Sequence, residues 1–371
     1  MESRDKKRIL VVGGGFAGVE CILKLESYFG NNHSFETTLV SEDNFLLFTP
    51  MLPQVAAGTI ETRHIVTPIR TLIKKTKFYE ARIKNIDPHG KIVTLFGTKE
   101  GRGMRIHYDF LVVALGSQTN FFGMKDVEEN SYKMNTINDA IILRNRIIDL
   151  LEQAENETDP ILRKSLLQIV VVGGGFAGVE TAGEINDFIN EIAEYYPSIN
   201  YKDVKVTLIE ALSGILNGFP EKLAVFAKEK LVERGIEVIL DAGVTSFDGQ
   251  EITLKSQSDS NKVLVGNSSE HRGHYKLKEI KSIQSNTLIW TAGTTPVDLI
   301  KESLFKTRKG RILVNEFLQV SQFPDVFAIG DCSIFDPILS MKKYPPTAQI
   351  AEAHAKTAAL NLKRLTDGEA M

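Results

Sequence analysis

The stretch Ile9–Glu20, ILVVGGGFAGVE, returns at Ile169–Glu180 as IVVVGGGFAGVE, and the two copies differ only at Leu10 and Val170. Each copy is an apolar run typical of a strand, then a glycine-rich turn, then the start of a helix. Glycines in this order let the backbone turn tightly and approach a pyrophosphate, whose charge then faces the helix N-terminus. One such turn is weak evidence. Two in matching contexts predict two dinucleotides on one chain, with electron transfer between them.

The order of strands and helices around the turns predicts an α/β fold with two Rossmann-like dinucleotide-binding domains. Apolar strands resume after the second copy, at Arg311–Val314 and Val326–Ile329. We therefore expect the second domain to be inserted into the first. The predicted domains are residues 1–125 with 297–371, and residues 126–296.

Three further elements follow from apolar spacing. The segment Arg63–Lys77 has helical spacing of Ile and Leu residues, and Phe110–Leu115 is a continuously apolar run that predicts an edge strand of a parallel sheet. A final helix is expected at Thr347–Leu365, with an apolar stripe formed by Ile350, Ala351, Ala358 and Leu362.

Composition excludes several function classes. A formal net charge of −3 gives no general attraction to nucleic acid or anionic lipid. No apolar window is long enough to span a bilayer, and the charged N-terminus MESRDKKR lacks a signal-peptide core. Cys21 and Cys332 form neither a CxxC pair nor a disulfide framework, which predicts a reducing compartment and two buried thiols.

One pair of histidines is a weak candidate for a metal site. His271 and His274 lie three residues apart in the polar stretch Lys255–Ser285, but no third ligand has suggestive spacing. We therefore expect a solvated loop or hairpin there, and no metal.

Acidic residues after the second strand of each unit are candidates for the ribose hydroxyls. Glu42 is the candidate in the first unit, although Ser41 is an alternative for the strand-end position. Glu210 follows its strand directly in the second unit. A carboxylate there binds a free 2′-hydroxyl and repels a 2′-phosphate, which favours NADH over NADPH. Gly330-Asp331 follows another apolar strand, which by itself indicates only a turn at a strand end.

Together these motifs resemble the two-dinucleotide flavoprotein reductases, and among them the type II NADH dehydrogenases, which are non-pumping NADH:quinone oxidoreductases carrying FAD. The general likeness rests on GGGFAG (13–18), ALGS (114–117), GGGFAGVE (173–180), TAG (291–293) and FAIGD (327–331). The narrower likeness rests on FLLFTPMLPQVAAGTI (45–60), NFFG (120–123), GFPEKL (218–223) and PPTAQIA (345–351). The resemblance covers nearly the whole chain.

The resemblance implies specific cofactor contacts. FAD would lie in the domain formed by residues 1–125 and 297–371, and NADH in residues 126–296. The implied FAD residues are Gly13, Gly15, Phe16, Ala17, Gly18, Glu42, Gly116, Gly330 and Asp331, with Thr49, Pro50, Ala348 and Gln349 against the flavin ring. The implied NADH residues are Gly173, Gly175, Gly178, Glu180, Glu210, Ala292 and Gly293.

Glu180 and Gln349 are the candidate catalytic residues. Glu180 and Glu184 share one helix face. The resemblance implies that the first of them is a proton-handling or gating acid near the flavin. Glu20 occupies the same place in the first copy, so the alternative is that Glu180 serves only the helix dipole. His354 is expected to be a surface residue of the final helix.

Two departures from the family pattern bear on the acceptor. The family carries a second glutamine four residues after Gln349, where this chain has Ala353. The family also continues into a membrane-resting segment, whereas this sequence stops at Met371. With no cysteine pair, electrons are expected to pass directly from the flavin to the acceptor.

The sequence therefore predicts an FAD-dependent enzyme that transfers electrons from NADH to a quinone without pumping protons. We expect it in the cytoplasm, peripheral to the inner face of the cell membrane, with a homodimer possible by family likeness. The alternatives are a soluble NADH:acceptor reductase serving a ferredoxin or similar partner, and a redox-responsive NADH-binding flavoprotein.

Overall fold

The computed structural model describes residues 6–96, 103–256, 263–266, 276–278, 280–335 and 346–371. The chain forms two compact units. Unit 1 comprises Met1–Leu47, Val66–Gln118 and Thr294–Met371, and unit 2 comprises Phe48–Ile65 and Thr119–Gly293. The predicted α/β class, with one domain inserted into the other, is confirmed. The chain enters unit 2 at Thr119 rather than at residue 126, and the short segment Phe48–Ile65 also belongs to unit 2.

The core of unit 1 is a largely parallel sheet built around β1 (Lys7–Val12). The last four residues of β1 are buried, as expected for a strand covered on both faces. It pairs in parallel with β2 (Phe35–Ser41) and β9 (Phe110–Val113). The sheet order is β21-β22-β23-β24-β9-β1-β2-β5, with β25 beside β22. The remaining bounds are β5 (Lys77–Glu80), β21 (Thr307–Arg308), β22 (Arg311–Val314), β23 (Gln319–Val320), β24 (Phe323–Ala328) and β25 (Ser333–Phe335).

The prediction that Phe110–Leu115 is an edge strand was wrong. β9 lies inside the sheet, because β24 pairs with it on the side away from β1, with Val326 opposite Leu111. The strand that covers this edge comes from beyond the inserted unit, more than two hundred residues later in the chain. Local sequence alone could not reveal it.

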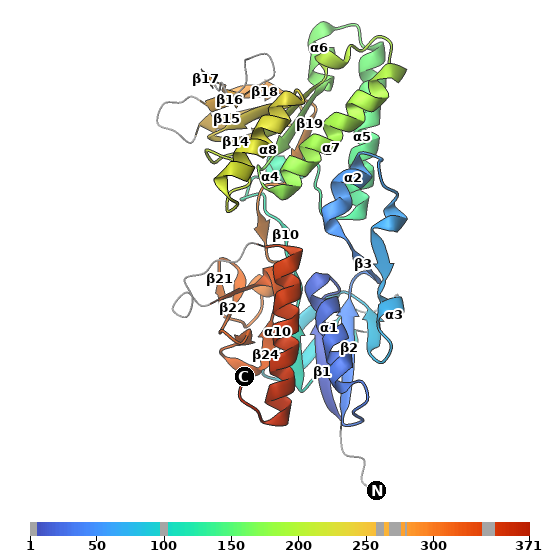
Figure 1. Ribbon diagram of the computed structural model, residues 1–371, viewed down its shortest axis with the longest axis vertical. Coiled ribbons are helices and arrows are strands. Elements are labelled where there is room, and N and C mark those ends of the chain that lie inside the picture. The colour runs from blue at the N-terminus through green and yellow to red at the C-terminus, as the bar shows by residue number, and fades with distance from the viewer. Residues whose placement is uncertain (1–5, 97–102, 257–262, 267–275, 279, 336–345) are drawn as a thin grey trace. The chain divides into compact units, whose positions relative to one another are not determined.

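Two long helices pack against each other in unit 1, α1 (Phe16–Phe29) and α10 (Ala348–Asp367). Figure 1 shows them side by side, in blue and red. Small buried alanines on α10, among them Ala355 and Ala358, allow a close approach to α1. Of the predicted apolar stripe, Ala351, Ala358 and Leu362 are buried and Ile350 is half-buried.

The predicted helix at Arg63–Lys77 was wrong. The segment contains a 3-10 turn η2 (Thr62–His64), the strand β4 (Val66–Pro68) and only a four-residue helix α3 (Ile69–Leu72). Pro68 is the reason, because proline has no backbone N–H to donate and ends or begins helices rather than continuing them. It stands here at the N-cap of α3.

Smaller elements complete unit 1. β3 (Phe45–Leu47) pairs with β4, and a separate sheet has the order β6-β7-β8. The bounds are β6 (Ile83–Asp87), β7 (Ile92–Leu95), β8 (Arg105–His107), β20 (Thr294–Thr295), α9 (Asp298–Lys301) and η5 (Gly330–Cys332), with β10 (Gln118–Thr119) at a point where the chain passes between units.

Unit 2 repeats the central pattern of unit 1. β11 (Gln168–Val172) pairs in parallel with β12 (Lys205–Ile209) and β19 (Thr287–Trp290), and the sheet order is β17-β16-β13-β12-β11-β19. A second sheet has the order β14-β15-β18. The other strands are β13 (Glu237–Leu240), β14 (Ala242–Phe247), β15 (Glu251–Ser256), β16 (Val263–Gly266), β17 (Lys276–Lys278) and β18 (Ser282–Gln284).

Helices of unit 2 cover its main sheet, with α7 (Phe176–Ile192) directly after the second glycine turn. The other helices are α4 (Lys125–Asn130), α5 (Ile137–Asn156), α6 (Pro160–Leu166), α8 (Glu221–Glu233), η1 (Thr49–Met51), η3 (Ala193–Tyr195) and η4 (Tyr201–Asp203). The short helix α2 (Leu52–Ala56) packs on α5 and α7, and its Leu52 and Val55 are fully buried (Figure 1). No helix within the described ranges is long and apolar enough to cross a bilayer.

Candidate dinucleotide-binding sites

Both glycine-rich turns have the backbone that a phosphate cradle needs. The φ angle is +109° at Gly13 and +111° at Gly173, a region that side chains rarely tolerate. A Cβ at Gly18 would lie 1.8 Å from the Gly13 carbonyl oxygen, and a Cβ at Gly178 would lie 1.8 Å from that of Gly173. Each helix is thus packed so closely onto its own turn that only glycine fits at Gly18 and Gly178.

The middle of each turn is open. Gly15 and Gly175 are exposed N-caps of α1 and α7, and a Cβ on either would meet nothing within 4 Å among the described residues. No described side chain caps either helix, so their first N–H groups face the open space. Behind the first turn, Phe16 is half-buried and Ala17 is buried.

Strand register identifies the residue that follows each second strand. Ile209 lies opposite the last residue of β11, and Glu210 comes next. In unit 1, Val40 lies opposite the last residue of β1, so Ser41 is the counterpart of Glu210. Glu42 is one residue further along and is exposed. The structure thus favours the alternative that the sequence left open, with Ser41 at the strand end.

Both strand-end side chains lie against the middle of their turn. Glu210 accepts hydrogen bonds from the N–H groups of Gly174 at 2.5 Å and Leu212 at 2.8 Å. The Ser41 hydroxyl occupies the space that a Cβ on Gly14 would need. The two cradles are therefore equivalent in shape and differ in charge, with a carboxylate only in unit 2.

Other predicted residues of unit 1 gather near its turn. The turn at Gly116–Ser117 presents the serine hydroxyl, which donates to Asp331 Oδ2 at 2.9 Å. Gly330 has a φ of +70°, and a Cβ there would lie 3.2 Å from that of Ala17 and 3.7 Å from that of Ala351. The strand-end residues, the glycine turn and the start of α10 therefore meet at one edge of the sheet.

The prediction that His354 is a surface residue was wrong. His354 is half-buried, its Nδ1 accepts from the Gly330 N–H at 3.3 Å, and its ring meets that of Phe335 edge-on at 5.6 Å. Burial lowers its pKa, and the nearby Asp331 carboxylate opposes this effect. A helical side chain one turn after a buried alanine faces inward, which is the signal that sequence reading missed.

The remaining flavin-ring candidates lie on different units. Ala348 is half-buried and Gln349 exposed in the first turn of α10, where Thr347 is the N-cap. Thr49 and Pro50 are exposed residues of η1, which belongs to unit 2. Their contacts with a flavin stay a prediction.

Ala292 and Gly293 lie beside the turn of unit 2. A Cβ at Gly173 would be 2.9 Å from the Ala292 backbone. A Cβ at Gly293 would be 2.7 Å from the ring of Phe122, and the Trp290 indole donates to the Asn120 carbonyl oxygen at 2.9 Å. The NFFG segment (120–123) thus packs directly against the residues that follow β19.

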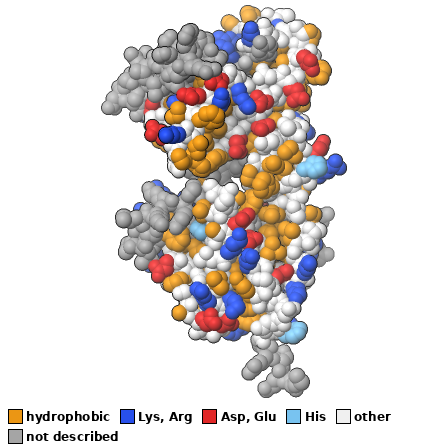
Figure 2. Space-filling view, in the orientation of Figure 1, with side chains coloured by type: hydrophobic (Ala, Val, Ile, Leu, Met, Phe, Trp, Pro, Cys, Tyr) orange, Lys and Arg blue, Asp and Glu red, His pale blue; other side chains and the backbone are white. Residues whose placement is uncertain are grey.

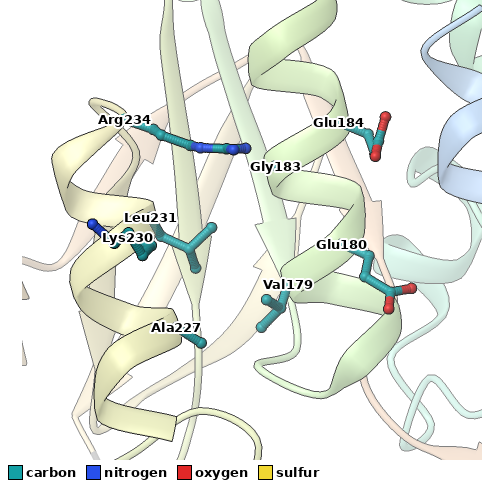
Figure 3. Close-up of a pocket in the computed structure, with 8 residues that line it drawn as sticks. All are labelled: Val179, Glu180, Gly183, Glu184, Ala227, Lys230, Leu231 and Arg234. Atoms are coloured by element: carbon teal, nitrogen blue, oxygen red, sulfur yellow. The ribbon is translucent and has the colours of Figure 1, made fainter. Parts of the chain in front are cut away.

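Glu180 and Glu184 lie on the same side of α7. Both line a groove of about 240 Å³ between α7 and α8, but Figure 3 shows their carboxylates pointing away from α8. Gln54 Nε2 on α2 donates to Glu184 Oε1 at 3.1 Å. Partial burial, and secondly the Glu184 carboxylate, raise the pKa of Glu180 above its ordinary value. Glu180 nevertheless stays exposed.

Apolar side chains are also exposed around the second turn. The rings of Phe176 and Phe219 meet edge-on at 4.7 Å, and Leu223 and Phe226 on α8 are both more than half exposed. Figure 2 shows hydrophobic surface over this helix. His271 and His274 lie outside the described residues. Within the described ranges, no three His, Cys, Asp or Glu side chains form a group that could hold a metal.

The two turns and the strand ends around them define a protein with two dinucleotide-binding domains. Residues 7–355 match the family model of the pyridine nucleotide-disulphide oxidoreductases, and the chain belongs to this family.

Relatives within this family carry more specific names. The chain is 34% identical over 363 residues to the external alternative NADH-ubiquinone oxidoreductase of Yarrowia lipolytica, covering 94% of this chain and 57% of that protein. It is 31% identical to a probable NADH dehydrogenase of Dictyostelium discoideum, covering 95% and 72%. Its fold matches NDH2 of Plasmodium falciparum, solved with NADH, with a TM-score of 0.81 and 22% identity over 98% and 83% of the two chains. The chain thus spans little more than half of the Yarrowia relative.

Proposed function

We propose that this chain is an FAD-dependent NADH:quinone oxidoreductase that does not pump protons. The observation that carries the proposal is the pair of equivalent cradles, of which only one ends in a carboxylate. The relatives named NADH-ubiquinone oxidoreductase and NADH dehydrogenase support this activity and its substrates.

The residues of unit 1 fit FAD. The open space at Gly15 admits a phosphate to the α1 N-terminus, and Ser41 offers a hydroxyl where the ribose would lie. Asp331, held by Ser117, offers a carboxylate to flavin hydroxyls. Bound FAD supplies hydride acceptance and onward electron transfer.

The residues of unit 2 fit NADH. Gly173, Gly175 and Gly178 form the cradle, and the Glu210 carboxylate would accept from the ribose hydroxyls. The same charge repels the 2′-phosphate of NADPH, so we propose NADH as the preferred donor.

We propose that Glu180 and Gln349 serve the acceptor. Reduction of a quinone by NADH consumes one proton besides the hydride, and a carboxyl group with a raised pKa keeps its proton to a higher pH than an ordinary glutamate does. Gln349 offers an exposed amide that can donate to a quinone carbonyl oxygen.

The cysteines support direct transfer to the acceptor. The sequence contains only Cys21 and Cys332, and both are free and buried. Neither can form the redox disulfide that gives the family its name, so electrons would leave the flavin without a thiol step.

We further propose that the protein works at a membrane surface, where quinones dissolve. The Yarrowia relative is named as a mitochondrial enzyme. For this chain, the cytoplasmic face of the cell membrane stays a prediction. A homodimer also stays a prediction.

The test is anaerobic mixing of the purified, yellow protein with NADH while the flavin absorbance band is recorded, followed by a short-chain quinone. Bleaching and then recovery supports the proposal. Ala353, at the place of the family's second glutamine, favours a soluble reductase as the second candidate. Recovery with an iron–sulfur protein but not with quinone would identify that reductase. Bleaching that persists with both acceptors would favour the third candidate, a redox-responsive NADH-binding flavoprotein.

A further inference from the structure

A hydrogen bond joins the inserted segment Phe48–Ile65 to α7. Gln54 Nε2 on α2 donates to Glu184 Oε1 at 3.1 Å, and both residues belong to unit 2. α2 is held in place because its residues Leu52 and Val55 are fully buried. The donor is therefore fixed by packing, and it constrains where the Glu184 carboxylate lies.

The side-chain amide of Gln54 turns its NH₂ group, not its oxygen, toward Glu184. Its Nε2 faces the carboxylate, while its Oε1 is buried and accepts no hydrogen bond from the described residues. Gln54 therefore fixes the position of the Glu184 carboxylate.

Glu180 lies one helical turn before Glu184 on the same face of α7, so the two carboxyl groups are neighbours. Figure 3 shows both on the side away from α8. The α8 cations that line the same groove already have partners, since Arg234 pairs with Asp187 at 2.9 Å and Lys230 with Glu233 at 2.6 Å.

A cation on α5 also lies near α2. The side chain of Arg144 is 3.9 Å from where a Cβ on Gly58, just after α2, would lie. Among the described residues, neither Arg144 nor another cation forms an ion pair with Glu184, so the charge of Glu184 acts on Glu180.

We propose that Gln54 and Glu184 are positioning residues for Glu180, with Gln54 fixing the place of the Glu184 carboxylate and that carboxylate favouring the protonated form of Glu180. This inference rests on the proposed function, in which the Glu180 carboxyl gives its proton to a quinone oxygen and becomes a carboxylate. The proton is then regained from solvent. The direction of the Glu180 pKa, raised by burial and by Glu184, agrees with this arrangement.

The test is an infrared pH titration of the resting, FAD-loaded protein, without NADH. The band of the protonated Glu180 carboxyl is identified as the one that Glu180→Gln lacks. In Glu184→Gln the neighbouring charge is gone, and we expect the proton affinity of Glu180 to fall about twofold, the size of a like-charge interaction at this spacing. Glu191→Gln removes an exposed charge from the same helix and should leave the band unchanged.

Gln54→Leu removes the donor but keeps side-chain bulk. The Glu184 carboxylate is then no longer held in place beside Glu180, so the Glu180 titration again moves to lower pH. This variant decides the question if Glu184→Gln does not fold. A Glu180 titration that is identical in the parent and in the folded variants would overturn the inference.

The catalytic role of Glu180 and the positioning roles of Gln54 and Glu184 are tested separately. Normal quinone turnover by Glu180→Gln would remove Glu180 from the proposed mechanism. The infrared titration would still report whether Gln54 and Glu184 control its proton.

Discussion

A methyl group at the tip of the second glycine turn should weaken dinucleotide binding without changing the stability of the fold. Gly175 has φ −77° and ψ −175°, an extended conformation that alanine adopts freely. A Cβ there meets nothing within 4 Å among the described atoms. We therefore expect Gly175→Ala to fold with unchanged stability and to place its methyl where the pyrophosphate would approach.

The magnitude follows from overpacking. Forcing a methyl into a tight contact costs about 1–3 kcal/mol. If the whole cost falls on the complex, the dissociation constant rises between about fivefold and about 150-fold. Isothermal titration of the oxidised protein with NAD⁺ measures this change without turnover.

A matched control lies two turns along the same helix. Gly183 is inside α7, and a Cβ there also meets nothing within 4 Å of the described residues. Gly183→Ala should leave NAD⁺ affinity unchanged and raise stability by about 1 kcal/mol, because glycine is a poor helix former. Equal NAD⁺ affinity in Gly175→Ala and the parent would refute the assignment of this turn as a phosphate cradle.

Three further outcomes are expected. Glu210→Gln should raise kcat/KM for NADPH relative to NADH by about tenfold, the effect of removing one close repulsion of about 1.4 kcal/mol, as measured by steady-state rates with both donors. Glu26 is partly buried, which raises its pKa, but hydrogen bonds from Thr76 and its neighbours outweigh this and hold the pKa below its usual value. Its contribution to stability is therefore full above the unfolded pKa near 4.5 and is lost as pH falls through the lower folded value, so Glu26→Gln should flatten the acid limb of a denaturant-midpoint profile. Burial raises the pKa of Cys21 to about 12 and that of Cys332 to about 11, so iodoacetamide at pH 8 should label neither thiol until the protein is unfolded, as read by mass spectrometry.

The parts of the fold that sequence could predict are those governed by local chemistry. The two turns were recognisable because positive φ and close helix packing demand glycine at fixed spacing. The Glu210 position was also readable, because its strand ends without ambiguity. Burial of Cys21 and Cys332 is confirmed.

The parts that sequence could not predict depend on partners distant in the chain. The choice between Ser41 and Glu42 required the register of β1 and β2, which one strand alone does not contain. The inward direction of His354 depends on Gly330 and Phe335, which come from other elements. The helical spacing at Arg63–Lys77 was outweighed by a single proline, a local signal that deserved more weight than periodicity.

The membership of α2 in unit 2 has a practical consequence for dissecting the molecule. A fragment spanning Thr119–Gly293 looks like a self-contained domain along the chain, yet it would lack the short helix whose Leu52 and Val55 bury the surfaces of α5 and α7. Expressed alone, this fragment would expose the apolar surface that α2 covers and would tend to aggregate. Grafting residues 48–65 onto its N-terminus through a flexible linker would be the way to obtain it soluble.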